Sequence, residues 1–320
     1  MNVLARSVAA LRPEAADFAQ DVMAGLAADP KRLPAKYFYD ERGSALFDAI
    51  TALPEYYPTR TELGILDAHA GDIARLIPRG AALIEFGSGS TTKARLVLRE
   101  AKTVTAYVPV DISATYLGEE AARLKRDLPK IEVLPIGADF TKPFDLPPEI
   151  GARPRVGFFP GSTIGNFEPH EAAQFLRHAA RLLGPGAIFI VGVDLIKDCA
   201  VLKAAYNDAE GVTAAFNLNL LRRINRELKG NFDLAHFRHY AFFNREQRRI
   251  EMHLASRFAQ KVRVRGKSFD FRRGETIHTE NSYKYTIDSF RALAGGTDWW
   301  PAAVWTDPAQ YFSLHALELR

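Results

Sequence analysis

The sequence predicts an α/β protein built around a parallel, doubly wound sheet. Between Ala81 and Leu195, short apolar runs alternate with amphipathic helical stretches, and such alternation is typical of a parallel sheet with helices on both faces. The first apolar run ends in the glycine-rich turn Glu85-Phe86-Gly87-Ser88-Gly89-Ser90, where the backbone can bend tightly and approach a ligand. These two observations favour a Rossmann-like core.

The elements of this core follow in order. We expect five strands, which lie within 81–86, 103–113, 131–140, 155–160 and 187–195. Helices are predicted between them over 91–101, 113–128 and 168–184. Helical spacing also precedes the core over 13–28 and follows it over 197–229, and the remaining strand-like runs, the last of them at 310–319, are expected partly to extend the sheet.

We therefore expect a second, smaller domain, built from the N-terminal helices and an insertion after the fifth strand. The predicted substrate-binding domain comprises 1–60 plus 197–285, and the predicted Rossmann-like domain comprises 61–196 plus 286–320. The chain has 320 residues, of which 47% are hydrophobic, enough for one large or two modest cores.

Composition argues against several classes of protein. The formal net charge of +4 is too small to indicate a nucleic-acid or membrane partner. Cys199 is the only cysteine, so the chain forms no internal disulfide and no thiolate metal cluster. The N-terminal stretch is a poor signal peptide, and no apolar run reaches 18 residues. We predict a cytoplasmic monomer.

The ends of the predicted strands suggest an adenosine-type ligand. Asp111, 22 residues after Gly89, can accept hydrogen bonds from ribose hydroxyls. Asp139 can bind an adenine amine, and the ring of Phe140 can lie on the base. Thr92 stands where a dinucleotide fingerprint has its third glycine, and this favours S-adenosylmethionine over a dinucleotide.

Five blocks spread over most of the chain resemble the histidine-specific Nα-methyltransferases of ergothioneine biosynthesis. They are KYFYDERGSALFDAIT, LPEYYPTRTE, IEFGSGSTTK, FFPGSTIGNF and IHTENSYKY. The resemblance implies a class I, S-adenosylmethionine-dependent enzyme with a substrate domain peculiar to the family. It also implies three successive methylations of L-histidine, which give hercynine.

The resemblance assigns roles to individual residues. Its implied cofactor contacts are Tyr39, Gly87, Lys93, Asp111, Asp139 and Phe140. Tyr56, Asn166 and Tyr206 are implied to hold the amino and carboxylate groups of the substrate, and they are our catalytic candidates. Glu280 and Ser282 resemble the pair that reads the imidazole, with Met252 beside the ring.

Physical chemistry supports some of these roles. A carboxylate at Glu280 that faces an imidazole N–H makes a charge-assisted hydrogen bond and rejects side chains lacking that donor. Ser282 shares a strand face with Glu280 if the segment is extended. Neither tyrosine nor Asn166 is a strong base, so the group that deprotonates the amine stays open between solvent and a tyrosine.

Each assignment has a purely structural alternative. Asn166 could cap the following helix, Glu280 could cap or pair with Lys284, and Met252 could be plain core. Tyr206 is expected in the middle of a helix, where its role is ambiguous. His236 and His239 have ligand-like spacing, but no acidic or cysteine cluster accompanies them, so we predict no metal site.

Other functions remain as alternatives. A related enzyme could methylate another small amino acid or a modified tryptophan, although Glu280 argues against an indole. A nucleic-acid methyltransferase is disfavoured because FFPGSTIGNF replaces the usual [ND]PP[YF] motif. A nicotinamide-dependent dehydrogenase lacks its third glycine, and a non-catalytic binding protein would not need the full set of site residues.

Overall fold

A computed structural model describes residues 15–320 of the chain. The N-terminal stretch that the sequence disfavours as a signal peptide falls mostly outside these residues. The described chain divides into two compact units. Unit 1 comprises Pro58–Ile196 and Lys284–Arg320, and unit 2 comprises 15–57 and Lys197–Tyr283. The predicted α/β class is confirmed.

Unit 1 is built on a mixed eight-stranded sheet in the order β13-β14-β7-β6-β2-β3-β4, with β5 also paired to β3. Its strands are β2 (Ala82–Phe86), β3 (Ala106–Asp111), β4 (Glu132–Val133), β5 (Ile136–Gly137), β6 (Arg155–Phe159), β7 (Ile188–Asp194), β13 (Trp299–Thr306) and β14 (Phe312–Leu319). The strands from β2 to β7 are parallel. The C-terminal strands β14 and β13 extend the sheet, as expected from the sequence, and they pair antiparallel.

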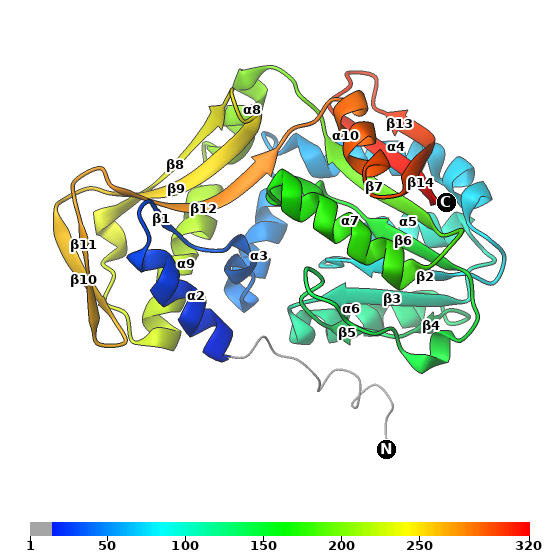
Figure 1. The fold of residues 1–320 in the computed structure, drawn as a ribbon, viewed down its shortest axis with the longest axis horizontal. Coiled ribbons are helices and arrows are strands. Elements are labelled where there is room, and N and C mark those ends of the chain that lie inside the picture. Colours follow the sequence, from blue (N-terminus) through cyan, green and yellow to red (C-terminus); the bar gives the residue numbers. More distant parts are fainter. Residues whose placement is uncertain (1–14) are drawn as a thin grey trace. The chain divides into compact units, whose positions relative to one another are not determined.

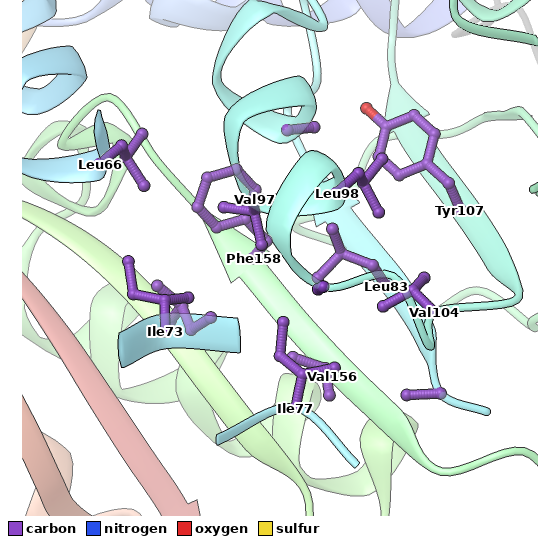
Figure 2. Packing of buried hydrophobic residues seen from close by; sticks show 14 of the residues in the cluster. Leu66, Ile73, Ile77, Leu83, Val97, Leu98, Val104, Tyr107, Val156 and Phe158 are labelled. Carbon is purple, nitrogen blue, oxygen red and sulfur yellow. The ribbon is translucent and has the colours of Figure 1, made fainter. Parts of the chain in front are cut away.

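Helices cover both faces of this sheet (Figure 1). They are α4 (Tyr57–Leu76), α5 (Thr92–Glu100), α6 (Ala114–Asp127), α7 (Pro169–Leu183) and α10 (Ile287–Gly295). Figure 2 shows the core on one face, where Leu66 and Ile73 of α4 and Val97 of α5 pack over Leu83 and Phe158 of the strands. On the opposite face of the sheet, the ring of Phe175 from α7 packs against three strand residues, Phe86, Phe159 and Phe189.

The third predicted strand, 131–140, is interrupted. It forms two short pieces, β4 and β5, with Leu134 and Pro135 between them. Proline has no N–H to donate to a sheet, which explains the break. Both pieces still pair with β3, so Asp139 stays two residues beyond the carboxyl end of β5.

Unit 2 combines helices with a four-stranded sheet in the order β1-β12-β9-β8 and a β10-β11 hairpin. Its strands are β1 (Lys31–Arg32), β8 (Phe237–Asn244), β9 (Arg249–Ser256), β10 (Gln260–Val264), β11 (Lys267–Phe271) and β12 (Thr276–Tyr283). Its helices are α2 (Ala15–Ala27), α3 (Glu41–Thr51), α8 (Cys199–Tyr206) and α9 (Val212–Leu228).

A β-bulge in β12 decides which side chains share a face of this sheet. His278 pairs with His253, but Glu280 pairs with Met252, so Thr279 is the extra residue. The buried Thr279 hydroxyl shares its one hydrogen between Asn217 Oδ1 at 2.9 Å and the carbonyl oxygen of Met252 at 3.0 Å. These bonds satisfy the extra residue and fix the bulge.

In the part of the chain that the structure describes, no helix combines the length and apolar character needed to cross a membrane.

Candidate functional site

The sheet of unit 1 has a topological switch point between β2 and β6. From β2 the chain proceeds to β3 on one side, whereas β6 lies on the other side and is followed by β7. In open α/β sheets, ligands bind beyond the carboxyl ends of the strands at such a point. The loops there carry Gly87 after β2, Asp111 at the end of β3 and Asn166 after β6.

The glycine turn after β2 is shaped by a close contact and by a carboxylate. Gly87 has a φ of +68°, and a Cβ on it would lie 3.2 Å from Cε1 of Phe140. Asp111 Oδ2 accepts a hydrogen bond from Gly89 N at 3.1 Å, and its Oδ1 accepts one from Ser113 N at 2.8 Å. Burial raises the pKa of Asp111, and these two bonds oppose that rise. Asp111 therefore orients the turn.

A second acid, Glu85, lies beneath the same turn. It is 1% exposed, and the Tyr107 hydroxyl donates to its Oε2. Burial raises the pKa of Glu85 to about 8, while the Tyr107 bond and the charge of Lys93 act in the opposite direction. Within residues 15–320, the buried hydroxyl oxygen of Ser88 has no hydrogen-bond partner. Asp111 and the unsatisfied Ser88 hydroxyl suit a cationic, polar ligand such as S-adenosylmethionine, whereas Glu85, with its raised pKa, is mostly neutral at pH 7.

Lys93, an implied cofactor contact, is held by a residue that the sequence analysis missed. Its Nζ lies 2.6 Å from Glu62 Oε2, and the Glu62 side chain has no exposed surface. Both Glu62 oxygens also accept from Gly161 N at 2.9 Å, in the loop that leads from β6 to Asn166. Glu62 ends the block LPEYYPTRTE, but an acid in a helical stretch carries no separate signal of this role.

Asp139 and Phe140 lie beside the turn but differ in their surroundings. Asp139 Oδ1 accepts a bond from Thr141 N at 3.1 Å, so one carboxylate oxygen shapes the local loop. The Phe140 ring lies 5.7 Å from Phe159 and 5.9 Å from Phe175, between centroids. The edge of the Phe140 ring packs against Gly87. That the ring also stacks on the adenine base of the cofactor stays a prediction.

Asn166 ends the 3-10 turn Thr163–Asn166, and it is not the cap of the next helix. Glu168 is the N-cap of α7, and its backbone N donates to Glu171 Oε2 at 2.9 Å. The capping alternative for Asn166 is therefore wrong, because a capping box with Pro169 at the first helical position starts α7 two residues later.

In unit 2, Tyr206 joins two predicted substrate residues. It is the last residue of α8, not a residue in mid-helix, because the chain turns at Asn207. Its hydroxyl donates to Ser282 Oγ at 2.7 Å in a buried contact. Its ring lies 6.4 Å from that of Tyr56. Tyr56, Tyr206 and Ser282 thus form one connected group.

The bulge places the remaining predicted substrate residues on one face of the unit 2 sheet. Met252 pairs with Glu280 and Ile250 pairs with Ser282, so their side chains project to the same side. Met252 is 2% exposed and Ser282 is 4% exposed. Lys284, the alternative partner for Glu280, has its Nζ 2.6 Å from Asp194 Oδ2 in a buried ion pair of unit 1.

Tyr39, which the resemblance assigns to the cofactor, lies in an aromatic cluster of unit 2. Its ring centroid is 5.7 Å from Phe47 and 5.8 Å from Phe216. Phe47 in turn lies 6.3 Å from Tyr56. Tyr39 is therefore linked through Phe47 to the Tyr56 group, whereas the other predicted cofactor residues belong to unit 1.

His236 and His239, which have ligand-like spacing in the sequence, contact different partners in the structure. His239 lies 2.9 Å from Asn217 Nδ2 through its Nδ1 and 2.8 Å from the Tyr206 carbonyl oxygen through its Nε2. Burial lowers the pKa of His239. His236 instead lies beside Asp233 on the surface. Both nitrogens of His239 serve the backbone and side chains of unit 2, consistent with a structural role.

Comparison with known proteins finds relatives of the chain over nearly its whole length. The family model described as "Histidine-specific methyltransferase, SAM-dependent" matches residues 18–319. The chain is 44% identical over 301 residues to a histidine N-alpha-methyltransferase of Mycolicibacterium smegmatis, with 92% of each chain covered. It is 41% identical over 300 residues to the protein of that name from Mycobacterium tuberculosis, also with 92% of each covered. A more distant relative, at 29% identity and 93% coverage of both chains, is a 4-dimethylallyltryptophan N-methyltransferase of Aspergillus fumigatus.

Proposed function

The chain belongs to the family of histidine-specific methyltransferases that depend on S-adenosylmethionine, and we propose that it converts L-histidine to its Nα-trimethyl form, hercynine. It is an N-methyltransferase, its methyl donor is S-adenosylmethionine, and its substrate is a small amino acid. The observation that carries the proposal of histidine is the grouping of Met252, Glu280 and Ser282 on one sheet face, with Tyr206 bonded to Ser282.

We assign donor binding to unit 1. Gly87 admits a close ligand approach, Asp111 supplies a carboxylate for ribose hydroxyls, and Asp139 and Phe140 are suited to the adenine. Lys93 supplies a cation for the methionine carboxylate and is held by Glu62. When bound, S-adenosylmethionine supplies an electrophilic methyl group on a sulfonium.

We assign histidine binding to residues of unit 2, and Asn166 stays a predicted substrate residue. The Glu280 carboxylate accepts from the imidazole N–H, and this contact selects against side chains that lack such a donor. Tyr56 donates to the substrate carboxylate without adding a charge, and Tyr206 does so when the Ser282 hydroxyl, 2.7 Å away, turns to donate to the Tyr206 oxygen. The amide of Asn166 can serve the amine through its oxygen or the carboxylate through its nitrogen. Tyr39 stays a predicted cofactor contact, and its ring packs on Phe47, which in turn lies beside Tyr56.

Three methyl transfers require three proton losses from the substrate nitrogen. The ammonium form of histidine has no lone pair, so one proton must leave before each transfer. Tyr56 and Tyr206 are two ionisable groups of this set, and their ring centroids lie 6.4 Å apart. We propose that the site mainly orients the neutral amine, and that protons pass to water directly or through a tyrosine hydroxyl.

Some predictions from the sequence stay predictions at this point. We expect a cytoplasmic monomer, and the modest net charge of +4 argues against a nucleic-acid or membrane partner.

Substrate selectivity tests the proposal. We would measure kcat/KM for L-histidine and for L-phenylalanine, whose ring has no N–H, in the wild type and in Glu280→Ala. The variant should lose about 10- to 150-fold on histidine, the value of one hydrogen bond to a charged group. Its affinity for S-adenosylmethionine should stay within about twofold. An equal preference for both amino acids in the wild type would overturn the assignment of histidine.

A further inference from the structure

Glu251, His253 and His278 lie together on one face of the unit 2 sheet, although His278 is 25 residues from His253 in the sequence. Glu251 and His253 are two residues apart in β9, so they project to the same side, and His278 of β12 pairs directly with His253. One ligand atom from each residue lies within 4.8 Å of the others. The rings of His253 and His278 are 5.0 Å apart between centroids. The three donors thus stand on adjacent, rigidly paired strands.

Neighbouring side chains orient each of the three. Glu251 Oε1 accepts from Asn244 Nδ2 and from Arg249 Nε, both at 2.9 Å. These bonds turn Oε2 toward His253 Nε2, which lies 3.1 Å away. His278 Nε2 lies 2.8 Å from Asn281 Oδ1, and the ring of Phe242 stacks on His253 at 5.5 Å. Outer contacts of this kind accompany the ligands of metal sites.

We propose that Glu251, His253 and His278 form a binding site for a divalent transition-metal ion, for which Zn²⁺ is the best match. Two imidazoles and one carboxylate are a donor set that Zn²⁺ accepts, with water completing four-coordination. Ligand atoms of a tetrahedral Zn²⁺ ion lie about 3.4 Å apart, given bonds of about 2.0–2.1 Å. The 3.1 Å between Glu251 Oε2 and His253 Nε2 is near this value, and the ligand atom of His278 lies within 4.8 Å of both residues' ligand atoms.

Charge and access are compatible with this ion. Glu251 carries the negative charge, and its pairing with Arg249 uses the oxygen that faces away from His253. The side chains of Glu251 and His253 are 10% and 13% exposed, so the site is sheltered but reachable.

The position of the site indicates a role in stability rather than in methyl transfer. The bulge at Thr279 places His278 and Glu280 on opposite faces of the sheet. Glu251 and Met252 are likewise neighbours on opposite faces. A bound ion would tie β9 to β12 behind the residues that we assign to histidine. The site therefore stabilises the substrate-binding strands without contacting the substrate.

A zinc titration of the full-length chain tests the proposal. Protein freed of metal by a chelator would be titrated with Zn²⁺ by calorimetry, for the wild type, His253→Gln and His278→Gln. We expect one Zn²⁺ per wild-type chain, and an affinity lower by about 100-fold or more in each variant, because even an orienting partner is worth about 10- to 100-fold. His236→Gln is the matched control, since His236 pairs with Asp233 outside the cluster, and it should bind as the wild type does.

X-ray absorption spectroscopy of the zinc-loaded wild type identifies the ligands of the ion directly. This test does not require the variants to fold. The account predicts two imidazole nitrogens and oxygen ligands around the ion. A spectrum without imidazole, or equal zinc affinity in the wild type and both cluster variants, would overturn the proposal. Zinc should also raise the melting temperature of the wild type and of His236→Gln, and leave that of His253→Gln unchanged.

Discussion

Glu62 holds Lys93 at 2.6 Å and, with the same carboxylate, accepts from Gly161 N at 2.9 Å through each oxygen. One buried acid thus joins the helix that follows the glycine turn to the loop that follows β6. Because Glu62 belongs to α4, a helix outside both segments, it fixes the distance between the two ligand-facing loops of unit 1.

This relationship predicts different effects on stability and on binding. Glu62→Gln leaves the largely buried Lys93 without its counter-charge and should cost about 3–5 kcal/mol of unfolding free energy. Lys93→Met should weaken S-adenosylmethionine binding. The double variant should regain much of the lost stability but none of the affinity. Urea unfolding and calorimetric titration with S-adenosylmethionine measure the two effects, and recovery of affinity in the double variant would contradict the role of Lys93.

The Tyr206–Ser282 hydrogen bond should act on the amino-acid site. Tyr206→Phe and Ser282→Ala should each raise the KM for histidine, and a double-mutant cycle should show a coupling of about 1 kcal/mol. Tyr57→Phe is the control, because it removes a hydroxyl that accepts from Lys197 Nζ at 2.8 Å in the same unit. Tyr57→Phe should lower stability and leave the KM for histidine unchanged. Additive effects of the first two variants would count against the connected group.

Gly87 should be irreplaceable for reasons beyond backbone strain. Alanine there costs about 1–2 kcal/mol for the left-handed conformation and also pushes on Phe140, 3.2 Å from the new Cβ. Gly80→Ala has a similar φ of +75° and meets nothing within 4 Å, so it isolates the strain. Both should lower the melting temperature, but only Gly87→Ala should lose S-adenosylmethionine affinity. Similar affinities in the two variants would place the cofactor elsewhere.

His315 should make the fold sensitive to acid. Burial lowers its pKa to about 3, and the charge of Arg291 acts in the same direction. The unfolded chain binds a proton near pH 6.5 and the folded chain does not, so stability falls as the pH drops from 6.5 toward 3. At pH 5 the loss amounts to about 2 kcal/mol. His315→Gln should flatten this part of the profile, which unfolding by urea at pH 7 and pH 5 measures. An unchanged slope would assign the acid sensitivity to other groups.

The sequence was most informative where backbone chemistry and position coincide. A glycine turn after an apolar strand, followed by an acid at the end of the next strand, predicts both the parallel sheet and the ligand edge. The same reasoning predicts one unbroken strand over 131–140, because the segment is largely apolar. Pro135 has no N–H to donate to the sheet, and the strand breaks there. This reasoning also placed Tyr206 in mid-helix, since the helix ends at Asn207 without a glycine or proline to mark it.

Contacts over long sequence separations were beyond prediction. Glu62 meets Gly161 across 99 residues, and nothing local distinguishes it from a solvent-exposed helical acid. His253 and His278 come together only because β9 and β12 pair in one register, and the bulge at Thr279 sets which side each residue faces. A one-residue change of register would exchange the faces of the sheet, and no pattern in these strands specifies the bulge.

The most direct test of the account is mass spectrometry of L-histidine incubated with the purified protein and S-adenosylmethionine, with each other amino acid treated separately. The account predicts mass increases of one, two and three methyl groups on histidine, ending at the trimethyl form, and none on the other amino acids. Methylation of a different amino acid, or of the imidazole ring in place of the α-amine, would contradict it.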